Sequence, residues 1–245
     1  MARIARLRKP ILLSSTQSRI PDRLQAVIFD MDGVIVDSHP AHRFAWKEFL
    51  GTLGKDVPDS ELDFVMDGRK REDILVHFLG PLSDAQLKEY GQLKNDLFWR
   101  AASEVVPIPG IFKFIECLNR AGIPMGLATS ASTNRARSTL KRMGLMGYFA
   151  TLVTGDEVRV GKPDPEIYQL ACQRINCPPS AAVAFEDAAS GVRAAKNAGL
   201  RCVGIASNGS GHKLTAAGAD YVVPDFLNLT VEMFHSFVAV SPPRS

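Results

Sequence analysis

The period of the hydrophobic and polar positions changes near residue 108. Between residues 37 and 107, apolar residues recur every three or four positions, which predicts helices over 43–53, 71–79 and 84–102. After Pro107-Ile108-Pro109-Gly110, short apolar runs alternate with helical patterns. Such an alternation predicts a parallel sheet covered by helices on both faces, so we expect an α/β fold with a doubly wound sheet.

The second part of the chain supplies most of the predicted sheet. Strands are expected over 124–128, 151–153, 181–185, 201–205 and 221–223, and helices over 111–121, 135–143, 165–174, 191–198 and 231–238. The stretch 207–211 is expected to be a surface loop.

One further strand comes before the helical stretch. An apolar run that begins at Leu24 ends in Asp30-Met31-Asp32-Gly33. We expect this strand in the same sheet, so residues 23–37 and 108–245 form the core and residues 38–107 form a small inserted helical cap. An insertion at the carboxyl end of a strand lies over the site that open α/β sheets place there.

Asp30 and Asp32 are one residue apart at the end of this buried strand. Residues that leave a strand into a glycine turn can face one pocket. Two carboxylates so close repel each other, unless a divalent cation neutralises them or one of them is protonated. A strand-end aspartate that only caps the following turn is the simpler interpretation.

Three later strand ends also carry polar groups. Thr129 and Ser130 open a hydroxyl cluster ahead of a helix, which suits either phosphate oxygens or an N-cap. Lys162 lies in a stiff proline-flanked loop, where the alternative is a solvated lysine. The 181–185 strand ends in Glu186-Asp187, whose oxygens suit magnesium. The joint occurrence of these groups at the ends of parallel strands favours one common site.

Four groups of residues therefore follow one another along the chain: Asp30 with Asp32, Thr129, Lys162, and Glu186 with Asp187. In this order they resemble the four motifs of the haloacid dehalogenase superfamily of phosphatases and phosphomutases, and the resemblance covers roughly residues 24–230. The resemblance implies a Rossmann-like core with a helical cap. It implies that Asp30 is the nucleophile that forms an aspartyl-phosphate, and that Asp32 gives and takes the proton. Thr129 would bond the transferring phosphoryl group, and Lys162 would offset its charge.

The same resemblance implies Mg²⁺ as the cofactor. The ion would lie on Asp30, the backbone carbonyl of Asp32 and Asp187, with Glu186 either a direct ligand or a support for the others. Dehalogenating relatives lack the second acid of the pair, because carbon–halogen cleavage has no alcohol to protonate. Asp32 therefore favours phosphoryl transfer.

The cap most resembles that of β-phosphoglucomutase and its sugar-phosphatase relatives. The resemblance implies that Arg71, with Lys94 and Asn95, grips a distal phosphate or sugar hydroxyls, and that His42 couples cap closure to Asp32. The simpler interpretations are that His42 packs against Trp46 and that Arg71 pairs with Asp73 on the surface. The substrate-binding candidates are His42, Trp46, Gly68, Arg71, Lys94, Asn95 and Ser130.

Three functions remain. The first is a magnesium-dependent phosphatase that hydrolyses small phosphorylated sugars or related metabolites. The alternative is a mutase that interconverts β-glucose-1-phosphate and glucose-6-phosphate, with a closed cap that excludes water. The third is a catalytically silent phosphate-binding protein. Two departures weigh against the mutase: a longer loop at 129–134, and Ala188 where serine is common after Glu-Asp.

Composition restricts the partners. The chain has 245 residues, 46% hydrophobic content and a formal charge of +3, which is too small to indicate nucleic-acid binding. Its apolar runs are shorter than the roughly 18 residues of a membrane span. We therefore expect a small phosphorylated metabolite as the partner, no nucleic acid or membrane partner, and a monomer or weak dimer.

The cysteines and the first residues bear on location. Four scattered cysteines are expected to be reduced thiols in the core, which suits the cytoplasm. Residues 1–22 form a basic extension with no acid before Asp22. A plain basic tail is favoured, since Pro10 breaks any amphipathic helix; a transit peptide for organelle import is the alternative if the source is eukaryotic.

Overall fold

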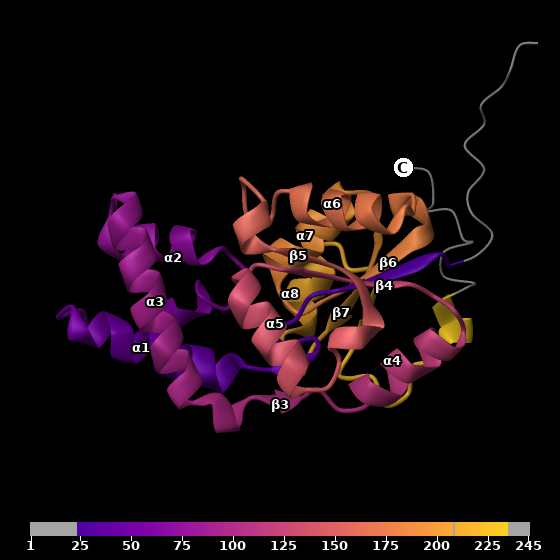
Figure 1. Cartoon of the computed structure of the whole chain (residues 1–245), viewed down its shortest axis with the longest axis horizontal. Helices are drawn as coiled ribbons and strands as arrows, with labels where there is room; N and C mark the ends of the chain where they lie inside the picture. The colour runs from indigo at the N-terminus through magenta and orange to yellow at the C-terminus, as the bar shows by residue number, and fades with distance from the viewer. Residues whose placement is uncertain (1–23, 208, 235–245) are drawn as a thin grey trace, which may run out of the picture.

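The computed structural model describes residues 24–207 and 209–234. Within these residues, six parallel strands form one sheet in the order β5-β4-β1-β6-β7-β8. This arrangement confirms the predicted α/β fold with a doubly wound sheet (Figure 1). The strands are β1 (Ala26–Phe29), β4 (Met125–Thr129), β5 (Phe149–Thr154), β6 (Ala182–Glu186), β7 (Arg201–Ile205) and β8 (Tyr221–Val223).

Strand β1 lies in the middle of the sheet, between β4 and β6. All four of its residues are buried because both faces of the sheet are covered, and this explains its continuous apolar run. The chain builds the sheet outward in both directions from β1, so the order of strands reverses there. Ligands of open α/β sheets bind in the crevice that such a reversal leaves at the carboxyl ends.

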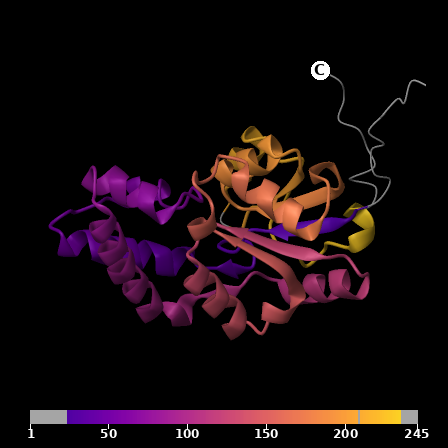
Figure 2. The ribbon, with the colours of Figure 1, turned by 45° about the horizontal axis from the view of Figure 1, so that its top comes forward.

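Helices cover both faces of the sheet. Val27 and Phe29 of β1 face the side covered by α4 (Ile111–Arg120) and α5 (Thr133–Arg142). Ala26 and Ile28 face the opposite side, because side chains alternate along a strand. That side is covered by α6 (Glu166–Ile175), α7 (Ala189–Asn197) and α8 (Gly211–Ala216), and Figure 2 shows the two helical layers with the sheet between them.

A helical insertion follows β1. It is the segment between β2 (Val36–Asp37) and β3 (Val106–Pro107), and these two strands pair with each other in antiparallel orientation. The insertion contains α1 (His39–Thr52), α2 (Arg71–Leu79) and α3 (Asp84–Arg100), and Figures 1 and 2 show these helices gathered beside the core. It has an apolar cluster of its own, built around Trp46, Phe49, Leu62 and Leu75.

The structure differs from the expectations in three places. β2 and β3 lie in the segment 37–107 or at its edge, where the periodicity predicts only helices. The pattern does not reveal them because a strand of two residues is too short to show a period. α8 begins at Gly211, inside the expected loop, and buries only Leu214, too little for an apolar stripe. α1 begins four residues early, because Pro40 is compatible with the first turn of a helix.

The predicted helix at 231–238 lies partly beyond the described residues, and the basic extension lies wholly beyond them. Residues 231–234 are helical, whereas 235–238 and 1–22 lie outside the described ranges. Short 3₁₀ helices lie between the other elements: η1 (Glu61–Asp63), η2 (Ala102–Glu104), η3 (Met146–Tyr148), η4 (Gly155–Glu157) and η5 (Pro179–Ala181).

The cysteines are free thiols, as expected. Cys117 is half-buried, and Cys172, Cys177 and Cys202 are buried. Burial raises the pKa of Cys172 to about 12, so this thiol is protonated at neutral pH. Over the ranges that the structure describes, every helix falls short of the length and apolar character that a bilayer crossing requires.

Candidate active site

The carboxyl ends of β1, β4 and β6 meet the helical insertion around a cavity of about 90 Å³. The core contributes Asp30, Asp32, Thr129, Ser130 and Asp187 to its wall. The insertion contributes most of the predicted substrate-binding residues, namely His42, Trp46, Gly68, Arg71, Lys94 and Asn95. Parallel strands bring their ends to one edge of the sheet, so residues far apart in sequence share this cavity.

Lys162 lies behind the cavity wall and is 2% exposed. Its Nζ donates to Oδ1 of Asp30 at 2.6 Å, to Oε1 of Glu186 at 2.5 Å and to the carbonyl of Ala128 at 3.0 Å. Burial lowers the pKa of an ammonium, but here the two carboxylates outweigh burial and raise the pKa of Lys162 above its ordinary value. The interpretation of Lys162 as a solvated lysine is therefore wrong.

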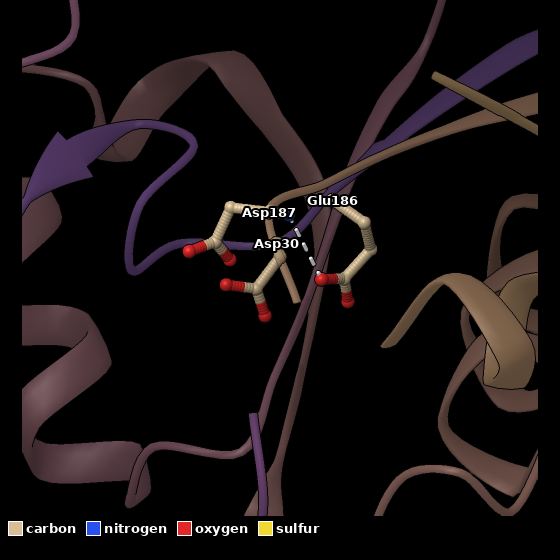
Figure 3. Close-up of side chains that lie close together, drawn as sticks. All are labelled: Asp30, Glu186 and Asp187. Atoms are coloured by element: carbon tan, nitrogen blue, oxygen red, sulfur yellow. Dashed lines mark hydrogen bonds between the residues drawn. The ribbon is translucent and has the colours of Figure 1, made fainter. Parts of the chain in front are cut away.

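Three carboxylates gather beside this lysine. Asp30, Glu186 and Asp187 each offer an oxygen within 4.8 Å of the others, and Figure 3 shows the carboxylates of Asp30 and Asp187 side by side. Burial raises the pKa of Asp30, and the charges of Glu186 and Asp187 add to this effect, so its pKa lies well above the usual value despite Lys162. Buried oxygen donors with uncompensated negative charge fit a hard divalent cation.

Glu186 differs from the other two acids in its hydrogen bonds. Its Oε1 accepts from Lys162 and from the hydroxyl of Tyr168, the latter at 2.6 Å. Its Oε2 accepts from the backbone N–H groups of Asp187 and Ala188. Glu186 therefore supports its neighbours and has little left to offer an ion, whereas Asp30 and Asp187 line the cavity.

Gly33 lets the chain pass close to Asp187. Its φ is +75°, and a Cβ at this position would overlap the Asp187 carboxyl group. Only glycine combines this left-handed backbone with such a close approach. The glycine that follows Asp-x-Asp in the sequence thus brings the turn after β1 against the end of β6.

His39 contacts Asp187, and nothing in the sequence pattern indicated it. Its Nε2 lies 2.9 Å from Oδ2 of Asp187. Burial lowers the pKa of a histidine, but the hydrogen bond and charge of Asp187 outweigh burial and raise the pKa of His39 to about 9. The first turn of α1 therefore delivers a cation to the acidic cluster.

In protein freed of divalent ions, we expect the contribution of His39 to stability to fall as pH rises from about 6.5 to about 9. The pKa of His39 rises from 6.5 to about 9 on folding, so its contribution is complete below pH 6.5 and is lost as pH passes 9. The loss should be on the order of 3 kcal/mol. Urea unfolding at pH 6 and pH 9.5 measures it.

His39→Gln should lack this loss, whereas His212→Gln should keep it because His212 is exposed and lies on α8. An equal fall in stability in the His39→Gln protein would mean that a different group titrates. The free energies of unfolding at the two pH values, compared between the two variants, separate these outcomes.

Asp32 is held by residues from two elements. Ser38 Oγ donates to its Oδ1 at 2.6 Å, and Arg135 of α5 donates from Nη1 to Oδ1 at 2.7 Å and from Nη2 to Oδ2 at 2.5 Å. Nε2 of His42 lies 3.5 Å from Oδ1. Burial raises the pKa of Asp32, but the charge and hydrogen bonds of Arg135 outweigh burial and hold it well below its usual range.

His42 connects Asp32 to Lys94. Nε2 of the ring faces the ionised carboxylate of Asp32, which can only accept, so the ring proton is on Nε2 and Nδ1 accepts from Nζ of Lys94 at 2.8 Å. Burial and the charge of Lys94 lower the pKa of His42 to about 3, so the ring is neutral. Lys94 also lies 5.2 Å from the ring centroid of Trp46. Trp46 is 1% exposed and packs against Phe49, so packing is its main role.

The remaining predicted residues join core and insertion. Ser130 donates to the carbonyl of Gly68 at 2.6 Å, so its hydroxyl bridges β4 to the insertion. Arg71 pairs with Glu72 at 2.6 Å, not with Asp73. The buried Nε of Arg71 has no hydrogen-bond partner among the described residues. Arg71 therefore keeps a polar group free near the cavity.

Thr129 is 1% exposed, and its Oγ1 accepts from the N–H of Ala131 at 3.2 Å. The N-cap of α5 is Ser132, whose hydroxyl accepts from the N–H of Arg135. The N-cap interpretation therefore applies to Ser132, and the hydroxyl of Thr129 lies at the cavity.

The assembled groups have a definite chemical capacity. A buried carboxylate paired with a lysine, a second carboxylate two residues on, and an acidic cluster that can bind a metal surround one cavity. Basic side chains of the insertion, Arg71 and Lys94 among them, line the same cavity. This set suits transfer of a phosphoryl group from an anionic small molecule.

Comparisons with known proteins agree with this chemistry. The family model for haloacid dehalogenase-like hydrolases matches residues 24–199. The chain is 34% identical to the phosphorylated carbohydrates phosphatase of Thermotoga maritima, over 86% of this chain and 100% of the relative. It is 32% identical to the β-phosphoglucomutase of Bacillus subtilis, over 86% of this chain and 94% of the relative.

A solved structure shows the same architecture. CbbY from Rhodobacter sphaeroides, crystallised with xylulose-(1,5)bisphosphate, superposes with a TM-score of 0.75 at 29% identity. The superposition covers 84% of this chain and 96% of CbbY. Both the core and the helical insertion thus have counterparts in proteins of known structure.

Proposed function

The chain belongs to the haloacid dehalogenase-like hydrolase family, and from this premise we propose that it is a magnesium-dependent phosphatase of small phosphorylated sugars. It is an enzyme of the phosphatase and phosphomutase class, as its relatives are. The observation that carries the proposal is the buried pair of Asp30 and Lys162 at the cavity, 2.6 Å apart. With Thr129 and Asp187 beside it, the carboxylate of Asp30 would attack the phosphorus atom of the substrate.

The first half-reaction transfers the phosphoryl group to the protein. A carboxylate oxygen of Asp30 attacks phosphorus, and the bond from phosphorus to the sugar oxygen breaks. The sugar oxygen takes the proton of the Asp32 carboxyl group and leaves as an alcohol. Lys162 and the hydroxyl of Thr129 offset the charge on the transferring group.

The second half-reaction returns the protein to its starting state. The Asp32 carboxylate takes a proton from water as the water oxygen attacks the phosphorus of the aspartyl-phosphate. The bond from phosphorus to Asp30 breaks, and inorganic phosphate leaves. The net reaction is hydrolysis of one phosphate ester.

The residues present fit a magnesium ion. Asp30, Asp187 and the backbone carbonyl of Asp32 would hold it, and Glu186 would keep Asp187 and Lys162 in place. A bound ion supplies charge that stabilises the phosphoryl oxygens and lowers repulsion between nucleophile and substrate.

A mutase is the second candidate, and the insertion favours it. Arg71 and Lys94 line the cavity, where they would suit a second phosphate group on the sugar. The 32% identity to a β-phosphoglucomutase supports the same alternative. A sugar hydroxyl would then replace water as the acceptor of the phosphoryl group.

One incubation separates these functions. The purified protein, magnesium and β-glucose-1-phosphate are mixed with a trace of the 1,6-bisphosphate, and free phosphate and glucose-6-phosphate are followed together. Free phosphate without glucose-6-phosphate supports the phosphatase. Glucose-6-phosphate without free phosphate establishes the mutase. If neither product forms and a panel of other sugar phosphates is also not hydrolysed, the result supports the catalytically silent phosphate-binding protein.

We also propose a cytoplasmic location and a monomer or weak dimer. The four free cysteines support the first part, because thiols stay reduced in the cytoplasm. Size-exclusion chromatography with light scattering tests the second.

A further inference from the structure

A second cavity adjoins Asp187. Its volume is about 200 Å³, whereas the cavity that Asp30 lines has about 90 Å³. We call the second one the flank cavity and the first one the substrate cavity. The flank cavity lies between the insertion and the core, and the residues that line it alone include Arg43, Asp63, Asp67, Ala189, Lys213 and Leu214. The insertion therefore encloses two spaces against the core.

Three residues line both cavities: His39, Met66 and Asp187. The two cavities are therefore neighbours, and these residues lie between them. Nε2 of His39 lies 2.9 Å from Oδ2 of Asp187, and Met66 is half-buried, with an unbranched and adaptable side chain. One hydrogen bond and one flexible side chain thus separate the flank cavity from the substrate cavity.

Oδ2 of Asp187 is enclosed by two neighbours. One is the backbone of Gly33, which approaches so closely that a Cβ on this residue would overlap Oδ2. The other is the imidazole of His39. Of these two, only the side chain of His39 can turn aside without a shift of the backbone, so His39 is the movable part of the enclosure.

The linings of the two cavities differ in charge. Four basic residues surround the acids of the substrate cavity: Arg69, Arg71, Lys94 and Arg135. In the flank cavity the basic residues face an acid, because Arg43 and Lys213 lie 2.9 and 3.8 Å from the carboxylate of Asp63. Asp67 adds a second acid there. A cation on its way to Asp187 therefore meets less repulsion in the flank cavity.

The flank cavity also has room for a hydrated ion. One water needs about 10–15 Å³ of such volume, so about 200 Å³ holds several waters. Mg²⁺ gives up its waters reluctantly and keeps several of them when it is bound. The smaller substrate cavity must hold the sugar phosphate, so an ion that passed through it would compete with the substrate for space.

We propose that the flank cavity is the passage by which a hydrated divalent cation reaches and leaves Asp187, and that His39 is the gate of this passage. The gate opens when the imidazole turns away from Oδ2 of Asp187, and it closes when the imidazole returns. The proposal rests on the magnesium site of the proposed function. It adds that the ion can exchange while a substrate occupies the substrate cavity.

Two variants that fill opposite cavities test the passage. Ala189→Phe fills the flank cavity from the first turn of α7, and Asn95→Phe fills the substrate cavity from α3. Ala85→Phe is the control, because Ala85 is exposed on α3 and lines neither cavity. Mn²⁺ is the probe. Calorimetry gives its Kd, and stopped-flow mixing of the loaded protein with a fluorescent chelator gives its release rate.

Ala189→Phe should slow the release of Mn²⁺ by roughly 10-fold or more and leave Kd within about twofold, because an obstruction raises the barrier to entry and to exit equally. Asn95→Phe and Ala85→Phe should leave the release rate within about twofold of wild type, since neither side chain lies in the passage. Unchanged release in the Ala189→Phe protein would overturn the passage, and so would a larger effect of Asn95→Phe.

A second variant covers the case in which Ala189→Phe fails to fold or changes Kd instead of the rate. Lys213→Trp obstructs the flank cavity from α8, and Lys213→Ala accounts for the lost charge. Release from the Lys213→Trp protein should be slower by about fivefold or more than release from the Lys213→Ala protein. Equal rates in these two proteins would overturn the passage.

The gate is tested by two uncharged replacements that differ in size. The association rate, which is the release rate divided by Kd, should be at least about threefold higher in the His39→Ala protein than in the His39→Phe protein, because only the phenyl ring still obstructs the passage. Neither variant has the hydrogen bond to Asp187, so the comparison isolates the obstruction. Equal association rates would overturn the role of His39 as the gate.

Hydrolysis of sugar phosphates, measured on the same wild-type protein, separates this proposal from the proposed function. If wild type hydrolyses them but Ala189→Phe and Lys213→Trp leave the release rate unchanged, the function stands and the passage is overturned. If these variants slow release but wild type hydrolyses no phosphate ester, the function fails and the passage stands. If calorimetry detects no binding of Mn²⁺ to wild type, the passage is overturned together with the metal site.

Discussion

We expect Asp30→Asn to lower the turnover number by at least about 10⁴-fold on any phosphate ester that the wild type hydrolyses. An amide cannot form the acyl phosphate through which both half-reactions pass. The fold should survive the change, because Lys162 keeps Glu186 at 2.5 Å and the carbonyl of Ala128. The melting temperature in the absence of divalent ions should not fall, because burial of the Asp30 charge and its repulsion by Glu186 and Asp187 outweigh the attraction of Lys162.

Release of inorganic phosphate and the melting temperature check both parts of this prediction. Asp56→Asn serves as the control, because Asp56 is exposed in the insertion and should keep wild-type activity. Turnover within tenfold of wild type in the Asp30→Asn protein would show that another group is the nucleophile.

Replacing Lys162 with methionine should have the largest effect on stability. The change leaves Asp30 and Glu186 buried without their shared cation, and removal of one partner from a buried ion pair costs about 3–5 kcal/mol. Magnesium should reduce the deficit, because a divalent ion at Asp30 and Asp187 supplies part of the missing positive charge. Activity should fall by at least about 100-fold, since Lys162 offsets charge on the transferring group.

Urea unfolding with EDTA and with magnesium chloride measures this effect. Lys55→Met is the control, because Lys55 is exposed and its loss should change stability by no more than about 0.5 kcal/mol. If the Lys162→Met protein is as stable as wild type in EDTA, then Asp30 and Glu186 are protonated when Lys162 is absent and need no cation.

The sequence determined the sheet and the place of its chemistry. The strands at 201–205 and 221–223 have the predicted bounds, and the others lie within two residues of them, because buried parallel strands are continuous apolar runs. The acids at the ends of β1 and β6 and the hydroxyl at the end of β4 interrupt apolar runs abruptly, so their meeting at one sheet edge follows from local pattern and parallel topology alone.

The partners of those residues were decided only by the tertiary structure. Arg135 reaches Asp32 across 103 positions of sequence, and His39 reaches Asp187 from the first turn of α1. In the sequence, Arg135 is one of several basic residues on a polar helix, and Asp187 is indistinguishable from Glu186 as a ligand. These residues acquire different roles because the packing of α5 and α1 against the strand ends decides which side chain is buried beside which charge. Burial depends on contacts between distant parts of the chain, and no local sequence pattern encodes those contacts.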